Sequence, residues 1–365
     1  MAPIGTAAEP NRRRILEIGE NGLFYFAMPE VTEAIYASYR ADLRRDRPYL
    51  GFGALLRIAR GVRNGNYDLV VLHPTQHAGW HPRSFLAAMR FSLLRGRFGE
   101  IWGALTSPLF LSALRFVRLP TMVAIDRGDA FSIPRHSFWM LDRARAFFKR
   151  ELPSDHWRVF YASAHRRLPG LSFRKRPRWI RRLSKLRPIG LGLGSFQIEA
   201  ADRAFGSPKT TDVFFAGAVE GNSTLRADVP RQLELLKAAG FTVDRPERAV
   251  PLDEFMQRCA QSWLTLSPEG LGWDCYRHME AAVCGSVPLV SAPSIHRYRP
   301  LVVGEQCLVY HPDEDGIVET VRTALADKAR LSAMAASARD HTLAHLTERA
   351  ICEAIVVEFA RGSAQ

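Results

Sequence analysis

The sequence is poor in the features that mark disulfide-bonded, zinc-binding and membrane-spanning proteins. Only five of its 365 residues are cysteines, and none forms a C-x-x-C pair or a zinc-binding spacing, so we expect reduced thiols. No apolar run approaches the ~18 residues that a spanning helix needs. The N-terminal arginines are not followed by an apolar segment, so we expect no signal peptide and a cytoplasmic protein.

Signatures of common enzyme classes are also missing. The sequence has no P-loop, no G-x-S-x-G nucleophile elbow and no sustained G-x-G-x-x-G, although "GLGLGS" at 190–195 comes close. Candidate metal sites are weak. His73, His77 and His81 are regularly spaced, but prolines and a glycine between them disfavour a regular helix. "DED" at 313–315 reads as a turn that opens a helix. We therefore expect no metal ion and no other cofactor.

Positive charge is in excess and unevenly distributed. The net charge is +13, and residues 143–187 form a basic segment in which only Glu151 and Asp155 are acidic. Such a segment binds nucleic acid, anionic lipid head groups or phosphorylated substrates, or it is a solvated face without a specific partner. Residues 83–118 combine an unusually apolar stretch with flanking arginines. We interpret them as core helices, with a membrane-surface patch as the alternative.

The periodicity of apolar residues predicts two α/β domains. In the first half we expect helices over 31–45, 53–64 and 83–118, and strands over 14–19, 23–28, 67–74 and 121–126. In the second half, helices of about ten to fifteen residues separate strands over 212–219, 241–244, 262–267, 287–291 and 306–312. Alternating strands and helices build parallel sheets. The sequence therefore predicts two Rossmann-like domains facing across a cleft.

Composition also suggests the domain boundaries. Residues 1–188 form the first domain and include the basic segment. Residues 189–210 are rich in Gly, Pro and Ser without sustained periodicity, so we interpret them as a linker. Residues 211–345 form the second domain. Residues 346–365 form a C-terminal helix that we expect to pack back on the first domain.

The stretch "SPEGLGWDCYRHMEAAVCGSVPLVS" (267–291) has the least ordinary polar pattern. We expect the Asp274 carboxylate to cap the helix that follows it and Gly285 to end that helix. Tyr276, Met279 and Val283 share one side of the helix and would pack on the sheet. These residues have structural explanations.

Four other residues of this stretch suggest a ligand. Gly270 and Gly272 would let a ligand approach the backbone at the carboxyl end of a strand, where open parallel sheets bind ligands. A phosphate suits the helix N-terminus, and Arg277 could add a charged contact. Glu280 suits a pair of sugar hydroxyls. The alternative is that Arg277 and Glu280 form an ordinary surface pair.

This stretch resembles the donor-site signature of exostosin-like and spore-maturation-type glycosyltransferases of the GT-B fold. In those proteins a Gly-rich loop, an "R..EA" helix, a glycine and a "PV" or "PLV" strand follow one another. "RAFFKRELP" (145–153) and "TDVFFAGA" (211–218) are similar to segments of the same proteins. The resemblance is specific over 211–325.

The resemblance implies a nucleotide-diphosphate sugar bound by residues 211–345, with residues 1–188 on the acceptor side. Arg277 would hold the diphosphate and Glu280 the ribose hydroxyls. The implied donor-binding set is completed by Gly217, Arg226, Glu269, Gly270, Gly272, Trp273 and Asp274. One departure matters: many retaining enzymes have two glutamates eight residues apart, whereas Glu269 and Glu280 are eleven apart. The retaining mechanism therefore cannot be carried over.

Glycosyl transfer needs stabilisation of the leaving nucleotide diphosphate and, for inversion, a base that activates the acceptor hydroxyl. Basic side chains and helix ends would serve the first need without a metal. Base candidates are Asp126, His73 and, third, Asp129. His73 and Asp126 each follow or end a predicted strand, and each has a structural alternative.

Three functions compete. The first is a glycosyltransferase acting on a hydroxyl of a glycan, lipid-linked or other cell-surface or secondary-metabolite acceptor, with its basic half at the inner face of the membrane. The second is a nucleic-acid or polyanion-binding protein that uses residues 143–187. Aromatic residues available there for stacking are Phe147, Phe148, Trp157, Phe173 and Trp179. The third is an inactive, transferase-like binding protein.

Overall fold

The computed structural model describes residues 14–38, 46–75, 86, 89–90, 93–94, 101–161, 177–312 and 316–359. The chain forms two compact units. The first consists of Met1–Asp126, Pro134–Phe147 and Ala354–Gln365, and the second of Arg127–Ile133 and Phe148–Glu353. The domain boundaries predicted from the sequence, 1–188, 189–210, 211–345 and 346–365, stay predictions.

One sheet has six strands in the order β2-β1-β3-β4-β5-β6. Its strands are β1 (Ile15–Gly19), β2 (Thr32–Tyr36), β3 (Leu69–Leu72), β4 (Met122–Asp126), β5 (Ala146–Lys149) and β6 (Leu186–Pro188). β1 pairs in parallel with β2 and β3, and β3 pairs in parallel with β4. Strands β1 and β3 are buried along their whole length, as expected for a parallel sheet covered on both faces.

The helices around these strands are mostly short. They are α1 (Leu23–Ala27), α2 (Phe52–Arg63), α4 (Ile101–Ala113), α5 (Phe138–Arg143) and α6 (Ile180–Leu183), with 3-10 turns η2 (Leu114–Phe116), η3 (Arg135–Ser137), η4 (His156–Phe160) and η5 (Pro177–Trp179). The helix predicted over 53–64 is confirmed by α2, and part of the helical region predicted over 83–118 by α4. Among the helices described here, none is long and apolar enough to cross a membrane.

Two predictions for the first 45 residues are wrong. Residues 23–28, predicted as a strand, contain helix α1, because the buried Glu17 carboxylate accepts the N–H groups of Phe24 (3.1 Å) and Tyr25 (2.8 Å) at its first turn. Residues 31–45, predicted as a helix, contain strand β2 instead. Parallel pairing with β1 supplies the backbone hydrogen bonds there, and tertiary pairing outweighs local helical spacing.

The second sheet has five strands in the order β11-β10-β9-β7-β8. Its strands are β7 (Thr211–Phe214), β8 (Val243–Asp244), β9 (Ser262–Ser267), β10 (Val287–Ser291) and β11 (Leu308–Tyr310), all paired in parallel. The strands predicted in this half are all confirmed. The helices are α7 (Ser195–Ala204), α8 (Thr224–Ala227), α9 (Val229–Ala238), α10 (Leu252–Ala260), α11 (Tyr276–Val283), α12 (Gly316–Leu325), α13 (Lys328–His345) and α14 (Glu348–Phe359).

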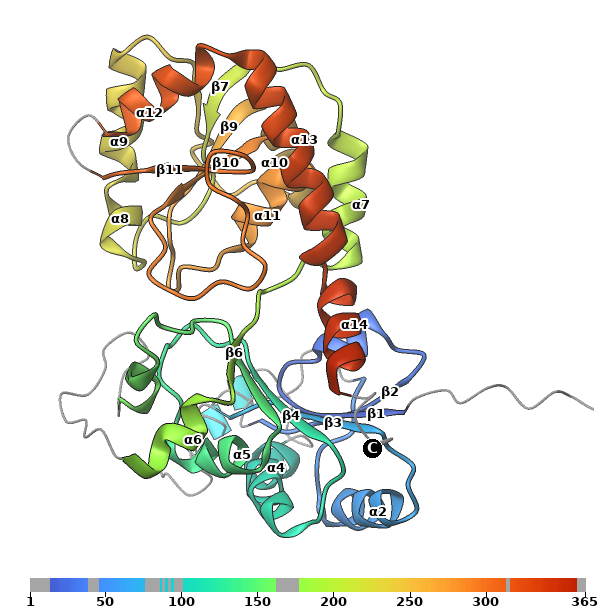
Figure 1. The fold of residues 1–365 in the computed structure, drawn as a ribbon. Helices are drawn as coiled ribbons and strands as arrows, with labels where there is room; N and C mark the ends of the chain where they lie inside the picture. Colours follow the sequence, from blue (N-terminus) through green and yellow to red (C-terminus); the bar gives the residue numbers. More distant parts are fainter. Residues whose placement is uncertain are drawn as a thin grey trace, which may run out of the picture. The chain divides into compact units, whose positions relative to one another are not determined.

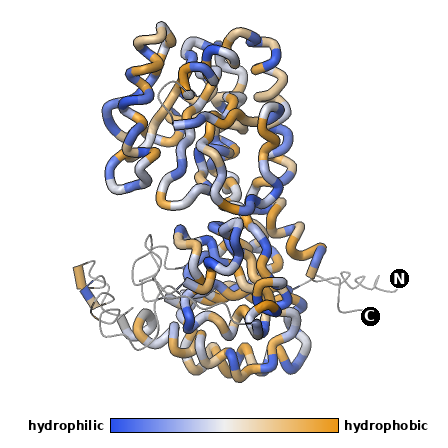
Figure 2. Tube along the Cα trace, turned by 60° about the vertical axis from the view of Figure 1, so that its left-hand side comes forward, coloured by the Kyte–Doolittle hydropathy of each residue, from blue (hydrophilic) through white to orange (hydrophobic). Residues whose placement is uncertain are grey.

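The second sheet has a hydrophobic core on each face. Helices α7, α10 and α11 cover one face, where Phe214 packs with Met256 and Met279. Helices α9 and α12 cover the other, where Phe215 packs with Leu233. Apolar and polar residues alternate along the helices in Figure 2, as expected for helices with one buried side.

The segment predicted as a linker, 189–210, contains helix α7. Its small residues Ala200, Ala201 and Ala204 are buried in the core on the α10 and α11 side. Alanine adds little to an apolar periodicity pattern, yet it lets helices approach closely. This explains why the sequence pattern missed the helix.

Substitution of Gly19 tests how tightly the first unit is packed around β1. Its φ is +149°, and a Cβ there would overlap the Cβ of His73. We expect Gly19→Ala to lower the free energy of unfolding by about 2 kcal/mol or more, because backbone strain and overpacking act together. Gly53→Ala is the matched control: a Cβ at Gly53 would have no atom within 4 Å, and within α2 it should stabilise by about 0.5–1 kcal/mol. Equal urea midpoints for the two variants would contradict this packing.

Candidate anion-binding site

The loops after β7 and β9 carry most of the sequence-predicted donor residues. β7 and β9 are parallel neighbours, so both loops leave the same edge of the sheet. Residues 215–223 follow β7 and lead into α8, and residues 268–275 follow β9 and lead into α11. The carboxyl edge of an open parallel sheet is where such folds bind ligands.

Arg277 lies in the first turn of α11 and is only 8% exposed. Its Nε donates to the carbonyl oxygen of Ala216 (2.9 Å), and its Nη1 lies 3.8 Å from the Cys275 sulfur. The guanidinium also lies over the Phe215 ring, 5.2 Å from its centroid. These contacts hold the guanidinium between the β7 and β9 loops.

Arg226, on α8, approaches the same sulfur and is also 8% exposed. Its Nη2 donates to the Pro268 carbonyl (3.0 Å) and lies 3.7 Å from the Cys275 sulfur. Its Nε is buried and has no hydrogen-bond partner among the described residues. Two guanidinium groups thus converge on Cys275.

The two arginines carry positive charge without a carboxylate partner. Within the described part of the chain, neither forms an ion pair with Asp or Glu. Burial lowers the pKa of Arg226, and the positive charge of Arg277 lowers it further. A buried cation pair of this kind favours an anion as ligand.

Two glycines make room for these arginines. A Cβ on Gly217 would overlap the Arg277 guanidinium, and a Cβ on Gly270 would lie 3.0 Å from Arg226 Nη2. The sequence predicted that Gly270 lets a ligand approach the backbone. In the structure it is an arginine side chain of the protein that occupies the space beside it.

Gly272 has a comparable role beside a buried glutamate that the sequence pattern did not single out. Glu151 accepts the backbone N–H groups of Trp273 (2.9 Å) and Asp274 (3.1 Å) and packs where a Gly272 Cβ would lie. Burial raises the pKa of Glu151, whereas the Arg150 charge opposes that shift. Glu151 thereby fixes the backbone of the β9 loop.

Arg150 links this glutamate to one of the base candidates. Its Nε donates to Glu151 (3.2 Å) and its Nη2 to Asp129 (2.5 Å). Asp129 is thus an ion-pair partner in the structure. Arg150 and Glu151 lie within "RAFFKRELP", so the resemblance of that segment was the only sequence signal for them.

The capping role predicted for Asp274 is wrong. The residue at the N-cap of α11 is Cys275, with no side-chain cap bond. The Asp274 carboxylate instead accepts the backbone N–H of Leu191 (2.9 Å), and burial raises its pKa. Asp274 lies one residue too early to reach the free N–H groups of the helix, so it ties the β9 loop to the segment after β6.

The packing side of α11 is also only partly as predicted. Met279 and Val283 are buried, but Tyr276 is exposed, and its hydroxyl accepts from Arg127 Nη2 (3.3 Å). Arg127 also donates to the Leu191 carbonyl and to Glu348. Arg127 therefore joins the start of α11, the segment after β6 and the start of α14.

The two glutamates of the predicted donor set differ in their surroundings. Glu280 accepts from Gln197 Nε2 of α7 (2.8 Å), and burial raises its pKa. Glu269 lies in the β9 loop, where burial raises its pKa and the Arg226 charge opposes the shift. The backbone carbonyl of Glu269 accepts from the Ser223 hydroxyl (2.8 Å), which links the β9 and β7 loops.

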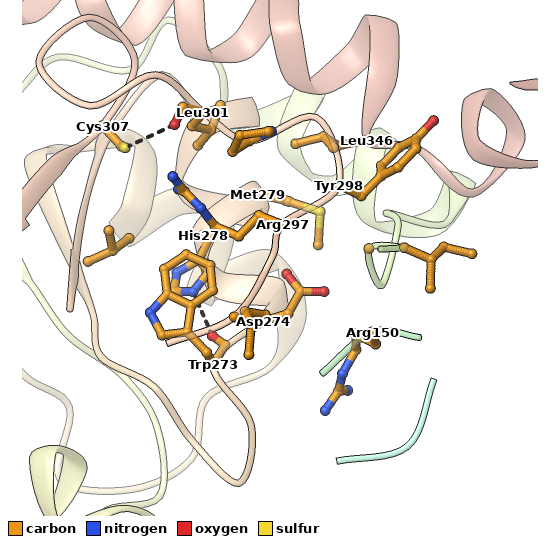
Figure 3. A pocket seen from close by; sticks show the side chains of 15 residues that line it. Arg150, Trp273, Asp274, His278, Met279, Arg297, Tyr298, Leu301, Cys307 and Leu346 are labelled. Atoms are coloured by element: carbon orange, nitrogen blue, oxygen red, sulfur yellow. Dashed lines mark hydrogen bonds between the residues drawn. The ribbon is translucent and has the colours of Figure 1, made fainter. Parts of the chain in front are cut away.

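A small cavity of about 50 Å³ lies beside the β9 loop. Figure 3 shows the Trp273 ring beside the His278 ring, with centroids 4.7 Å apart and planes tilted by 42°, and with Asp274 and Arg297 nearby. The Nε2 of His278 lies 3.0 Å from the Trp273 carbonyl, so that nitrogen carries the proton. Its Nδ1 is buried and lacks a partner in the described structure, and burial lowers the pKa of His278 to about 3.

The remaining base candidates, His73 and Asp126, belong to the first unit. His73 is buried after β3. Its Nδ1 lies 3.0 Å from the Ile125 carbonyl and its Nε2 2.8 Å from Glu17 Oε1. Both ring nitrogens are therefore engaged. Asp126 is the last residue of β4 and is partly buried.

Candidate metal ligands do not cluster in the described part of the chain: no three His, Cys, Asp or Glu side chains there could hold a metal ion. His77, His81 and residues 313–315, which the sequence analysis weighed as metal ligands, lie outside the described residues.

The buried neutral His278 predicts a pH dependence. Unfolding exposes an imidazole with an ordinary pKa near 6.5, whereas the folded form resists protonation down to about pH 3. The unfolded state therefore binds more protons between these values, and stability falls as the pH falls. As the pH falls from 6 to 4, the free energy of unfolding of the wild-type protein should decrease by about 1 kcal/mol per pH unit more than that of His278→Gln. The measurement is the free energy of unfolding from urea titrations at several pH values. If wild type and His278→Gln showed the same pH dependence, His278 would not be buried and neutral in the folded protein.

Comparison with known proteins gives a fold but no family. No family model matches the sequence, and no curated protein does either. A glycosyltransferase from Rickettsia africae matches with a TM-score of 0.51 at 9% identity, over 97% of this chain and all of that one. The N-terminal domain of trehalose-6-phosphate phosphatase from Candida albicans has a TM-score of 0.51 at 11% identity, over 98% of this chain and 99% of that one. The two parallel α/β sheets match GT-B glycosyltransferase structures, which confirms the predicted fold class.

Proposed function

We propose that this protein is a glycosyltransferase, akin to the exostosin-like type, that moves a sugar from a nucleotide-diphosphate sugar to an acceptor hydroxyl. The observation that carries the proposal is the pair of buried guanidinium groups, Arg226 and Arg277, which lack carboxylate partners in the described structure. They lie at the carboxyl edge of a parallel sheet. A diphosphate is the anion of the right charge for two arginines at such an edge.

The chemistry assigned to this pair is stabilisation of the leaving group. As the glycosidic bond to the diphosphate breaks, negative charge grows on the phosphate oxygens. Fixed guanidinium groups in a partly buried site favour that charge without reorganising. In this proposal they take the part that a divalent cation plays in other transferases, so no metal is needed. The interaction with a charged phosphate oxygen contributes about 1.5–3 kcal/mol per hydrogen bond.

The other donor residues have supporting roles in the proposal. Glu280 binds the ribose hydroxyls through a carboxylate that Gln197 orients. Glu269, Gly270, Gly272, Trp273 and Asp274 shape the β9 loop, which Glu151 holds by two backbone hydrogen bonds. Gly217 leaves room for Arg277 in the β7 loop.

For the base we propose the same three candidates, Asp126, His73 and Asp129. To act as the base, His73 would have to give up one of its two buried contacts, and Asp129 would have to leave its ion pair with Arg150. The proposed acceptor is a hydroxyl group of a glycan, a lipid-linked sugar or another hydroxyl compound.

Several observations weaken the nucleic-acid alternative. Phe147 and Phe148, expected to be available for stacking, are buried. Lys149 is buried and donates to the Ala130 carbonyl, and Arg150 is ion-paired. These basic and aromatic side chains are buried or engaged within the protein, so they are not available to contact nucleic acid. Residues 162–176 of the basic segment lie outside the described residues.

A thermal-shift comparison tests the anion site. UDP, GDP, dTDP and ADP are added separately at millimolar concentration, and at least one should raise the melting temperature. Stabilisation is about 2.7 kcal/mol at a ligand concentration of about one hundred times Kd. Arg277→Ala should abolish the shift, because it removes one of the two guanidinium groups. Arg245→Ala, which replaces an exposed arginine of the same unit, should keep it.

Two outcomes would redirect the proposal. If no nucleotide shifts the melting temperature while single-stranded oligonucleotides bind with a steep salt dependence, the polyanion-binding function replaces it. If a nucleotide binds but the corresponding nucleotide sugar is neither transferred to an acceptor nor hydrolysed without one, the protein is better described as an inactive binding protein. Slow donor hydrolysis without an acceptor would support the transferase.

A further inference from the structure

An apolar groove with arginines along it lies on the first unit, among residues that the proposed function does not use. We call it the α2 groove and define it by Leu56, Arg60, Val62 and Arg63 of α2 together with Phe116 and Arg118. It has a volume of about 730 Å³. Figure 1 shows α2 at the periphery of the first unit.

The apolar side chains of this surface are unusually exposed. Phe116 is 80% exposed and Leu56 is 43% exposed, and Phe52, at the start of α2 but outside the residues that line the groove, is 64% exposed. Isolated exposed apolar residues are ordinary, but several around one groove mark an interaction surface. Leaving such side chains in water is unfavourable, so a partner that buries them gains free energy.

The charges of the α2 groove all have one sign. Arg60, Arg63 and Arg118 are exposed, and none of them has a carboxylate partner among the described residues. Two further arginines lie close by: Arg115 lies over the Phe116 ring, 4.8 Å from its centroid, and Arg57 pairs with Glu33 (3.7 Å). Among the residues that the structure describes, none that lines the groove is acidic.

We propose that the α2 groove docks the protein on a bilayer that contains anionic lipids. An interfacial helix buries aromatic and aliphatic side chains at the level of the acyl chains, while arginines bind lipid phosphates above them. Leu56, Val62 and Phe116 provide the apolar side chains, and Arg60, Arg63 and Arg118 provide the arginines. Nucleic acid would match the charge, but of the apolar side chains that define the groove only Phe116 has a ring on which a base could stack, whereas Leu56 and Val62 are aliphatic.

Flotation with vesicles tests the proposal on the full chain. Vesicles of phosphatidylcholine alone are compared with vesicles that contain about 30% phosphatidylglycerol at low salt. We expect substantial flotation only with the anionic vesicles, and less of it as salt rises, because exposed charges are screened. Equal flotation with both vesicle types would overturn the proposal. So would release of the protein from anionic vesicles by a single-stranded oligonucleotide at stoichiometric concentration.

Matched variants distinguish the contribution of the α2 groove to vesicle binding from the contribution of the net charge. Arg60→Glu with Arg63→Glu should lower the vesicle partition coefficient by about tenfold or more. Arg245→Glu with Arg248→Glu changes the net charge equally at exposed sites of the second unit and should lower it by much less. Phe116→Ser should weaken binding, whereas Phe196→Ser, exposed on α7, should not.

The proposal fails if the two charge-reversal variants lose the same affinity, or if Phe116→Ser binds as wild type does. Because every substituted side chain is exposed, thermal melting should confirm that all variants fold. Nucleotide binding measured on the same variants should stay unchanged. A result that contradicts membrane docking by the α2 groove can therefore be distinguished from one that contradicts the proposed transferase function.

Discussion

Arg226 and Arg277 place two like charges in one buried part of the second unit, each only 8% exposed and both directed at the Cys275 sulfur. A buried charge that has lost its partner costs about 3–5 kcal/mol in proteins where mutation created it. The fold tolerates the pair here by giving each guanidinium a backbone carbonyl, from Ala216 and Pro268. Those carbonyls are dipoles and leave the net charge in place. An anionic ligand would balance it.

Much of the surrounding structure serves to hold these groups. Gly217 and Gly270 are small because the guanidinium groups lie against them, and Gly272 is small because Glu151 does. Glu151 in turn holds the backbone of Trp273 and Asp274. The segment around Arg150 and Glu151, which precedes β6, therefore positions a loop that lies more than a hundred residues later in the chain. This long-range contact gives two backbone N–H groups of the β9 loop a buried partner.

The sequence predicted the second unit better than the first, for a physical reason. Its strands are continuous apolar runs and its helices have clear apolar sides, so local patterns and tertiary structure agree. In the first unit, Glu17 turns residues 23–27 into a helix and pairing with β1 turns residues 32–36 into a strand. Neither effect can be read from a local pattern. Arg277 was singled out from its position in the motif and Arg226 from the resemblance, whereas Glu151 and Arg150 act through tertiary contacts that no local pattern shows. Asp274 was given a local role, but its carboxylate accepts from Leu191 instead.

The most direct test of the account is a crystal structure of the protein grown with the nucleoside diphosphate that stabilises it most. The account predicts that the diphosphate lies between the β7 and β9 loops, with phosphate oxygens within hydrogen-bond distance of both Arg226 and Arg277. It also predicts that the Glu151 bonds to Trp273 and Asp274 are retained. A nucleotide bound elsewhere, with both guanidinium groups still directed at Cys275, would contradict the central claim.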